Sequence, residues 1–308
     1  MTATANRSRS GGRAWRPALL AAALAAPLAV SAATTPAPPA ESGQPVLRVC
    51  ADPSNLPFSN QAEQGFENRI AHLLANRLGA TLDYAWYPMQ MGFARNTLAN
   101  YMPQEGRYSC DLIIGTTTGL EVGKTTRPYY HSSYVMLYRR GQGLDEVQSL
   151  EDLLTLPEDQ LRSLRIGVFA GSPVADWLVR HGLMKQAVSY KAQSGSREVT
   201  PGSIIRRDLA SGEVDLMLVW GPIGGYYAQA LSDCTECRFR DIAAVSLEPG
   251  PGRPYVFGIA MGVRYGNDAW LETVQGLIDD NREQILDILQ DYNVPTVEPW
   301  APPGQARR

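Results

Sequence analysis

Two hydrophobic periods alternate along this chain, and their order constrains its fold more than any other feature. Short apolar runs of strand length, such as 46–51, are followed by segments whose apolar residues recur at helical spacing, as in 66–78. Strand and helix patterns that alternate in this way predict an α/β fold.

The alternation divides into two similar units. The first contains expected strands at 46–51, 82–86 and 111–115 and expected helices at 66–78 and 92–100. The second contains expected strands at 165–170 and 214–219 and expected helices at 174–181, 204–209 and 221–230. The chain then returns through a strand-like run at 255–262 into a long amphipathic helix. We expect two α/β lobes joined by two crossover strands, with a central cleft where ligands usually bind.

Composition indicates where the folded part begins and ends. Residues 33–45 are rich in Pro, Ala and Thr, which is typical of a solvated linker, and the C-terminal residues are rich in Pro. The first crossover is expected at 134–138 and the second just before Tyr255. The expected division is signal peptide 1–32, linker 33–45, first part of lobe 1 46–136, lobe 2 137–250, return strand and C-terminal helix of lobe 1 251–294, and flexible tail 295–308.

The N-terminal residues have the pattern of an export signal. Arginines between residues 7 and 16 precede an apolar stretch at 18–30, which ends in the small-residue pattern Val30-Ser31-Ala32. The stretch is too short to span a bilayer, and no later run approaches the roughly 18 residues that a transmembrane helix needs. We expect an exported protein with no membrane span after cleavage.

The balance of charge excludes two classes of partner. The whole chain has a formal net charge of −3 at pH 7, and removal of the arginine-rich leader makes it more acidic. A mildly acidic protein does not follow the phosphates of nucleic acid and offers no basic face to anionic lipid. We expect neither nucleic acid nor a membrane surface as a partner.

Two motifs resemble elements of the type II periplasmic solute-binding proteins. Gly65-Phe66-Glu67, followed by an amphipathic helix, is similar to their "GF-acid" element. The stretch from Asp111, DLIIGTTTGLEVGKTTRPYY, is similar to their strand, Thr-rich turn and first hinge. The resemblance covers about 47–294, and it implies the type II periplasmic binding protein fold and a periplasmic location.

Three longer stretches resemble one particular branch of these solute-binding proteins. They read RVCADPSNLPFSNQAEQGFENRIAHLLANRLGA, TTRPYYHSSYVMLYR and DLMLVWGPIGGYYA. They resemble the quinoprotein-dehydrogenase-associated branch, the MxaJ/XoxJ-type "J" proteins that accompany periplasmic, PQQ-dependent methanol and other alcohol dehydrogenases. The resemblance implies an accessory role in the maturation or activation of such a dehydrogenase, with the dehydrogenase or its cytochrome c as partner. It implies no quinone and no metal in this chain.

The cleft lacks the charged groups with which receptors of this fold hold a free amino acid. In those receptors an Arg soon after the Thr-rich turn clamps the ligand carboxylate. Here Glu121 stands in that region, and the nearest cations, Lys124 and Arg127, lie further along. The acid that would hold the α-ammonium group falls near Trp220-Gly221 and is also missing. Each lost contact is worth about 2–5 kcal/mol, so we do not expect an amino-acid ligand.

The residues expected in the cleft combine hydrogen-bonding groups with an aromatic wall. This mixture suits a small polar ligand or a protruding segment of a partner. They are Asp52, Asn55, Phe58, Phe66, Glu67, Thr116, Thr117, Ser172 and Trp220.

Structural roles remain open for several of these residues. Asp52 and Asn55 precede turns, where such side chains often bond the local backbone. Phe58 and Phe66 can pack in the core, and Glu67 can favour a helix N-terminus. Packing at the hinge is the interpretation that we favour for most of the tyrosines between 129 and 138.

Four cysteines in an exported protein predict disulfides, with three possible connectivities. In this fold the strands next to Cys50 and Cys110 are neighbours, whereas Cys234 and Cys237 bracket two residues of one loop. We therefore expect the pairs Cys50–Cys110 and Cys234–Cys237. A c-type haem would need His where Arg238 stands. A thioredoxin-like site belongs at a helix start, and a zinc site needs more Cys or His nearby, so no metal site is expected.

The sequence contains no recognisable catalytic motif. His72, His131 and His181 are grouped neither with one another nor with a plausible nucleophile. Phosphate-binding loops, the GxSxG elbow and the GxGxxG fingerprint are absent. We expect a non-catalytic protein without a cofactor.

Three hypotheses for the function follow. The leading one is a periplasmic accessory protein of a quinoprotein alcohol dehydrogenase. The alternative is a receptor that delivers a small polar solute, other than an amino acid, to an ABC importer. The third is a sensory lobe or a dehydratase-like enzyme, and the absence of fused transmembrane and signalling segments in this sequence argues against the sensor.

Overall fold

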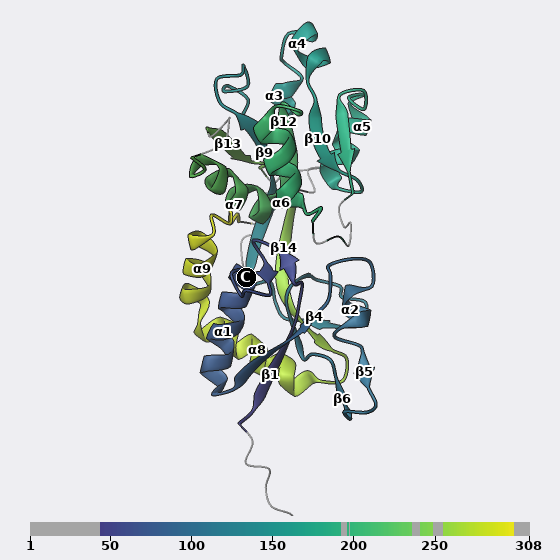
Figure 1. Cartoon of the computed structure of the whole chain (residues 1–308), viewed down its shortest axis with the longest axis vertical. Helices are drawn as coiled ribbons and strands as arrows, with labels where there is room; N and C mark the ends of the chain where they lie inside the picture. Colours follow the sequence, from purple (N-terminus) through teal and green to yellow (C-terminus); the bar gives the residue numbers. More distant parts are fainter. Residues whose placement is uncertain (1–43, 192–195, 197, 236–240, 249–254, 299–308) are drawn as a thin grey trace, which may run out of the picture. The chain divides into compact units, whose positions relative to one another are not determined.

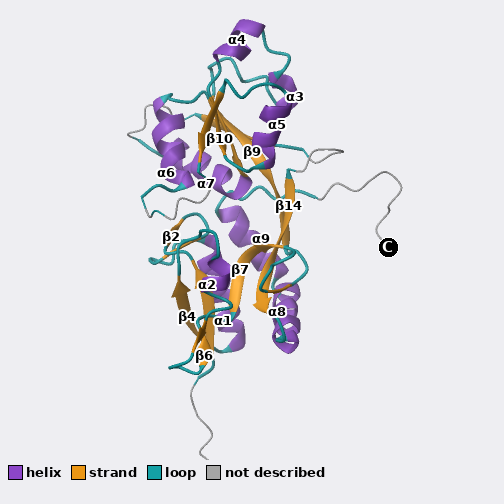
Figure 2. Ribbon diagram, turned by 90° about the vertical axis from the view of Figure 1, so that its right-hand side faces the viewer, coloured by secondary structure: helices purple, strands orange, loops and turns teal. Residues whose placement is uncertain are grey.

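The computed structural model describes residues 44–191, 196, 198–235, 241–248 and 255–298. The signal peptide expected at 1–32 and most of the expected linker lie outside the described residues. Within them, strands and helices alternate, and the strands form one ten-stranded sheet beside two small two-stranded sheets (Figures 1 and 2). The α/β fold class expected from the hydrophobic periods is confirmed.

Parallel strands build the first half of the large sheet. β1 (Val46–Ala51) lies between β4 (Thr81–Trp86) and β7 (Leu112–Thr117) and pairs parallel with both. Parallel neighbours need a crossover connection, and helix α1 (Phe66–Leu78) supplies it between β1 and β4. Its buried face, which includes Ile70, packs in the main core of this half.

Two long antiparallel strands in the middle of the sheet connect its two halves. These are β9 (Tyr130–Arg139) and β14 (Val256–Arg264). β9 changes partners along its length, because residues 130–133 pair with β14 and residues 134–139 pair with β12 (Leu216–Trp220) and β13 (Ile242–Ser246). With β10 (Ile166–Phe169) and β11 (Ala187–Tyr190), the main path of the sheet is β11-β10-β12-β9-β14-β7-β1-β4. Off this path, β13 pairs with β9, and β8 (Gly123–Thr125) pairs with β14.

The second half of the sheet repeats the parallel arrangement. β10 (Ile166–Phe169) pairs parallel with β11 (Ala187–Tyr190) on one side and with β12 on the other. The expected first crossover, 134–138, lies inside β9, and β14 provides the return strand. Much of the expected second crossover falls within 249–254, outside the described residues. The lobe boundaries given above therefore stay a prediction.

The remaining helices and strands of the described residues are short, apart from α7, α8 and α9. They are β2 (Ser54–Asn55), β3 (Ser59–Asn60), α2 (Phe93–Asn96), β5 (Tyr101–Met102), β6 (Arg107–Tyr108), β8 (Gly123–Thr125), α3 (Leu150–Leu153), α4 (Glu158–Ser163), α5 (Pro173–Arg180), α6 (Pro201–Ile204), the π-helix η1 (Ile205–Leu209), α7 (Gly221–Ser232), α8 (Asp268–Asp280) and α9 (Arg282–Asp291).

Two expected helices differ from the prediction. The helix expected at 92–100 is the single turn α2, because the backbone of Thr97 leaves the helical region and its hydroxyl donates to the Phe93 carbonyl oxygen at 2.7 Å. The long C-terminal helix is divided into α8 and α9 at Asn281, whose φ is −119°. The Asn281 side chain donates to the Leu277 carbonyl oxygen at 2.7 Å and accepts from Arg77 at 2.6 Å, which fixes the break.

The segment after α9 contacts the crossover strand β9 and helix α7. Val297 N donates to the His131 carbonyl oxygen at 3.0 Å, and the Ser132 hydroxyl donates to the Pro295 carbonyl oxygen. The same segment lies against α7, where a Cβ on Gly225 would come within 1.9 Å of the Asn293 carbonyl oxygen. Gly225 therefore allows a close approach that any larger residue would prevent.

A disulfide links the end of β1 to the residues just before β7. Cys50 and Cys110 are bonded, with their Cα atoms 5.4 Å apart, in the pairing that the sequence favours. Cys234 is also in a disulfide, but Cys237 lies outside the described residues, so the predicted pair Cys234–Cys237 stays a prediction.

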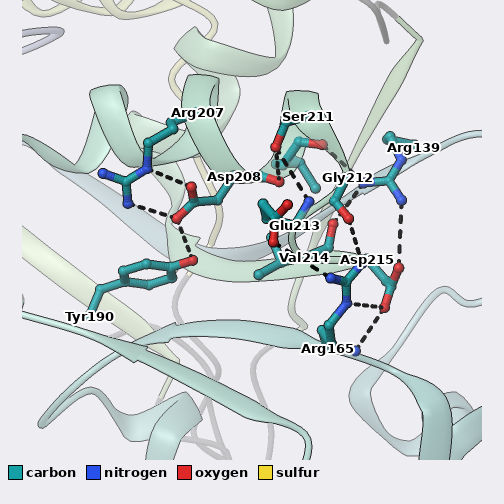
Figure 3. A network of polar contacts seen from close by, with 11 residues as sticks. Arg139, Arg165, Tyr190, Arg207, Asp208, Ser211, Gly212, Glu213, Val214 and Asp215 are labelled. Carbon is teal, nitrogen blue, oxygen red and sulfur yellow. Dashed lines mark hydrogen bonds and ion pairs between the residues drawn. The ribbon is translucent and has the colours of Figure 1, made fainter.

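A buried guanidinium group stabilises the second half of the sheet (Figure 3). Arg139, at the end of β9, donates to the carbonyl oxygens of Leu209 and Val214 at 2.9 and 2.7 Å, and it lies 3.6 Å from Asp215. The Leu209 carbonyl is at the C-terminal end of η1, where helices leave carbonyl groups without partners. Arg139 thus ties the end of the π-helix and the start of β12 to the crossover strand.

The other end of this network fixes the π-helix to β11. Asp208 accepts a hydrogen bond from the Tyr190 hydroxyl at 2.7 Å and is bound by two nitrogens of Arg207 at 2.6 and 2.8 Å. The pKa of the Asp208 carboxyl is lowered, chiefly by its hydrogen bonds from Arg207. The last two residues of η1, Asp208 and Leu209, are therefore tied to β11 and to β9.

The helices of the described ranges include none that is both long enough and apolar enough to cross a membrane.

We predict that Arg139→Met destabilises the protein by about 2–4 kcal/mol, because buried carbonyl groups lose their donor and a buried charged contact is removed. The matched control is Arg140→Met, since the adjacent Arg140 makes an exposed ion pair with Asp241, and exposed pairs contribute about 0–1 kcal/mol. Urea unfolding of both variants measures the difference. Equal losses in the two variants would contradict the role given to Arg139.

Candidate functional site

A cavity of about 400 Å³ is lined by residues from both halves of the sheet. Its walls come from the loop after β1, the first turn of α1, strands β7, β9 and β14, and the region around α6 and α7. The described lining residues are Ala51, Asp52, Ser54, Asn55, Phe58, Ser59, Glu67, Pro88, Met89, Phe93, Ile113, Gly115, Thr116, Thr117, Tyr130, Tyr134, Ser196, Val199, Thr200, Pro201, Trp220, Ile223, Phe257 and Ile259.

Strand alternation explains why these residues meet. Successive side chains of a strand point to opposite faces, so Tyr130 and Tyr134 share one face of β9, and Phe257 and Ile259 share one face of β14. In the ladder Ile259 stands opposite both Tyr130 and Thr117. The cavity therefore lies over a continuous face of the crossover strands.

Three aromatic rings form a wall of the cavity. Tyr134 and Trp220 meet edge to face with their ring centroids 5.5 Å apart, and Phe257 lies 5.9 Å from Trp220 and 6.3 Å from Tyr134. Trp220 ends β12 and stands opposite Tyr134 in the ladder. Edge-to-face packing of three rings holds each of them in place.

Glu67 is the acid that faces this cavity without a hydrogen-bond partner. It occupies the first turn of α1, and no group among the described residues donates a hydrogen bond to its carboxyl oxygens. Gly115 makes room for it, because a Cβ there would lie 2.0 Å from Oε1 of Glu67. Burial, and secondly the charge of Asp52, raise the pKa of Glu67 to about 8.

Asp52 also lines the cavity, but its carboxylate is occupied by the backbone. One oxygen accepts from Ser54 N at 2.7 Å and the other accepts from Met89 N. The Ser59 hydroxyl in turn donates to the Asp52 carbonyl oxygen at 2.8 Å. These bonds shape the turn after β1, as an Asx residue at this kind of position often does.

Seven of the nine residues expected in the cleft line the cavity: Asp52, Asn55, Phe58, Glu67, Thr116, Thr117 and Trp220. That these residues bind a ligand or a partner remains a prediction.

Two expected residues lie elsewhere. Phe66 is fully buried among the core residues of the first half, because the position before Glu67 on α1 faces the sheet rather than the cavity. Ser172 caps α5, and its hydroxyl accepts from Ala175 N at 3.3 Å. Neither residue contributes to the cavity wall.

The sequence interpretation did not assign the aromatic residues of the crossover strands to the site. Packing at the hinge is the interpretation favoured above for most of the tyrosines between 129 and 138, without a role for Tyr130 or Tyr134 individually, and Phe257 has no assigned role. Their period-two spacing on β9 and β14 was the available signal, but using it required knowing that both strands pass beneath one cavity.

Basic side chains are missing from the described lining of the cavity. Lys124 and Arg127 instead make ion pairs with Asp268 and Asp279, at 2.6 and 2.7 Å, and Glu121 pairs with Arg95. The part of the wall that the structure describes thus offers no guanidinium or ammonium clamp for a carboxylate. Within the described ranges, no group of three or more His, Cys, Asp or Glu side chains is placed to hold a metal ion.

A mixed sheet with two crossover strands and a cavity lined from both of its halves defines the class of periplasmic binding proteins. The structure aligns with the crystal structure of the periplasmic binding protein XoxJ from Methylobacterium extorquens AM1 at 30% identity and a TM-score of 0.63, covering 82% of this chain and 99% of that one. No protein-family model matches the chain.

Two further relatives agree with this assignment. Protein MoxJ of Paracoccus denitrificans is 27% identical over 276 residues, which span 86% of this chain and 94% of that protein. The crystal structure of MxaJ from Methlophaga aminisulfidivorans MPT shares the fold at 22% identity and a TM-score of 0.61, covering 82% of this chain and all of that one. The chain belongs to the MoxJ/XoxJ/MxaJ type of periplasmic binding proteins.

We predict that Glu67→Gln changes how stability depends on pH. The unfolded chain ionises Glu67 near pH 4.5, whereas the folded protein holds its proton until about pH 8, so the wild type loses stability as the pH rises through this window. Between pH 5 and 8 it should lose on the order of 3 kcal/mol relative to the variant, after allowance for water in the cavity. Urea unfolding at several pH values measures this, and parallel curves for the two proteins would contradict the raised pKa.

Proposed function

We propose that this chain is a non-catalytic periplasmic accessory protein of a PQQ-dependent methanol or other alcohol dehydrogenase, and that it assists the maturation or activation of that enzyme. The partner would be the quinoprotein dehydrogenase, or the cytochrome c that serves it. In this proposal the chain is exported by its N-terminal signal and carries no cofactor of its own.

The observation that best supports this proposal is that the described lining of the cavity contains no Lys, Arg or His. An amino-acid receptor of this fold holds the ligand carboxylate with a bidentate Arg, and here the nearby cations Lys124 and Arg127 are used in ion pairs on the outside. Loss of that clamp supports a role other than amino-acid capture. Kinship with MoxJ and XoxJ, together with the motif resemblance of the sequence, supports the dehydrogenase as the partner.

We predict that deletion of the gene for this chain lowers alcohol dehydrogenase activity in periplasmic extracts severalfold, and that expression of the wild-type chain restores it. The amount of dehydrogenase protein and its PQQ content, measured in the same extracts, separate two roles. Loss of PQQ or protein indicates maturation, whereas normal amounts of inactive enzyme indicate activation.

Co-purification of the chain with the dehydrogenase provides a second readout. Arg140→Met is the control for complementation, since its ion pair is exposed and outside the cavity. Full dehydrogenase activity in the deletion strain would refute the proposal.

The second candidate is a receptor that delivers a small polar solute, other than an amino acid, to an ABC importer. The observation in its favour is the cavity itself, whose volume of about 400 Å³ lies in the range of small-molecule sites. A ligand at a hundredfold excess over its Kd would stabilise the protein by about 2.7 kcal/mol. Loss of uptake of that ligand in the deletion strain, with normal dehydrogenase activity, would favour this candidate.

A further inference from the structure

The described lining of the cavity has an unbalanced charge. Among the described residues that line it, the groups that can carry charge near neutral pH are the carboxyl groups of Asp52 and Glu67, and no Lys, Arg or His accompanies them. Tyr130 and Tyr134 also line it, but burial raises the pKa of both hydroxyls above the ordinary value, so they stay neutral. A ligand that complements this lining does not carry a negative charge.

The two carboxyl groups are not equivalent. Both oxygens of Asp52 accept backbone N–H groups of Ser54 and Met89, which leaves it little capacity for a ligand. Glu67 accepts no hydrogen bond from the described residues, and the missing Cβ of Gly115 keeps space for its carboxyl group. Of the two carboxyl groups, Glu67 is therefore the one whose oxygens remain for a ligand.

The aromatic wall completes the site. Tyr134, Trp220 and Phe257 line the same cavity as Glu67, and the faces of aromatic rings attract cations, with Trp the most effective. We propose that the cavity binds a small organic cation of the methylated ammonium type, held by the aromatic wall and by the carboxylate of Glu67. The inference concerns the cavity alone and does not depend on the proposed dehydrogenase partner.

The lining favours a methylated over a primary ammonium group. A primary ammonium carries three N–H donors that need acceptors once water is removed. Much of the described wall consists of aromatic and aliphatic side chains, including Phe58, Ile113, Ile223 and Ile259. A trimethylammonium group has no N–H donor and presents methyl groups to such a surface, so its burial leaves no donor unpaired.

Binding of a cation should be linked to the loss of a proton. Four titratable groups interact electrostatically with Glu67, and none of them is a base. They are Asp52 in the loop after β1, Tyr84 on β4, and Tyr129 and Tyr130 at the start of β9. The free protein therefore holds a proton on Glu67 at neutral pH, whereas a bound cation favours the ionised form. Affinity rises as the pH approaches 8 and levels off above it.

The test uses two probes of the same shape. Choline carries a trimethylammonium group, and its tert-butyl analogue has carbon in place of the quaternary nitrogen and no charge. We expect the purified chain to bind choline with an affinity that rises roughly 50-fold between pH 6 and pH 8, from a Glu67 pKa of about 8. The neutral analogue should bind more weakly and without pH dependence. Isothermal titration calorimetry in two buffers of different ionisation enthalpy also measures the expected release of nearly one proton at pH 7.

Matched variants locate the site. Glu67→Gln should weaken choline binding about tenfold or more at pH 8 and abolish the pH dependence, because the carboxylate is lost. Glu63→Gln makes the same chemical change four residues away, at an exposed acid that pairs with His72, and should leave binding unchanged. A thermal unfolding curve confirms that each variant is folded.

Several results would overturn the inference. Equal binding of choline and its neutral analogue would show that shape rather than charge is recognised. Choline affinity that does not change with pH, or that survives Glu67→Gln, would remove Glu67 from the site, and no binding of choline at millimolar concentration would reject the ligand class. Normal dehydrogenase activity in the deletion strain would refute the proposed function without affecting these measurements.

Discussion

The structure depends on the antiparallel pairing of β9 with β14. Residues 130–133 of β9 pair with 256–259 of β14, and beyond this short ladder β9 joins the second half of the sheet while β14 joins the first. The backbone hydrogen bonds of four residue pairs thus hold together two groups of parallel strands. The same pairs set the cavity, because Tyr130, Phe257 and Ile259 belong to them and line it.

The hydrophobic periods of the sequence were sufficient to predict the fold class. Runs such as 46–51 and 66–78 carry strand and helix periodicity in their own residues, and the structure has β1 and α1 at these positions. Helix ends were harder to predict. The break at Asn281 depends on Arg77, which is 204 residues away in the chain and invisible to a local pattern.

Seven of the nine residues expected in the cleft line the cavity, and the position of several others depends on packing that a local pattern does not show. Phe66 and Glu67 are adjacent in one motif, but one turns toward the core and the other toward the cavity, and only the packing of α1 on the sheet decides which. Ser172 was expected in the cleft, but its hydroxyl caps the N-terminus of α5. Tyr134 and Phe257 become neighbours through the β9–β14 pairing, a long-range contact that residue spacing alone does not reveal.

Glu67 is a partly buried carboxyl group without a hydrogen-bond partner among the described residues, and its raised pKa opposes folding at neutral and higher pH. A protein selected for stability alone would place an apolar residue or a partner there, since an unpaired buried carboxyl is costly in its charged form. In addition, the position beside the carboxyl group is occupied by Gly115, where any side chain would collide with Glu67. Uncompensated costs of this kind are characteristic of functional sites.

The segment that follows α9 affects how the two halves of the sheet can move. Hinge bending in a two-part protein normally distorts only the crossover strands. Here Pro295 and Val297 are hydrogen-bonded to β9, and Asn293 is packed against Gly225 on α7, so a third length of chain spans the hinge. Any bending of β9 and β14 would therefore also have to bend this segment or break its contacts with α7.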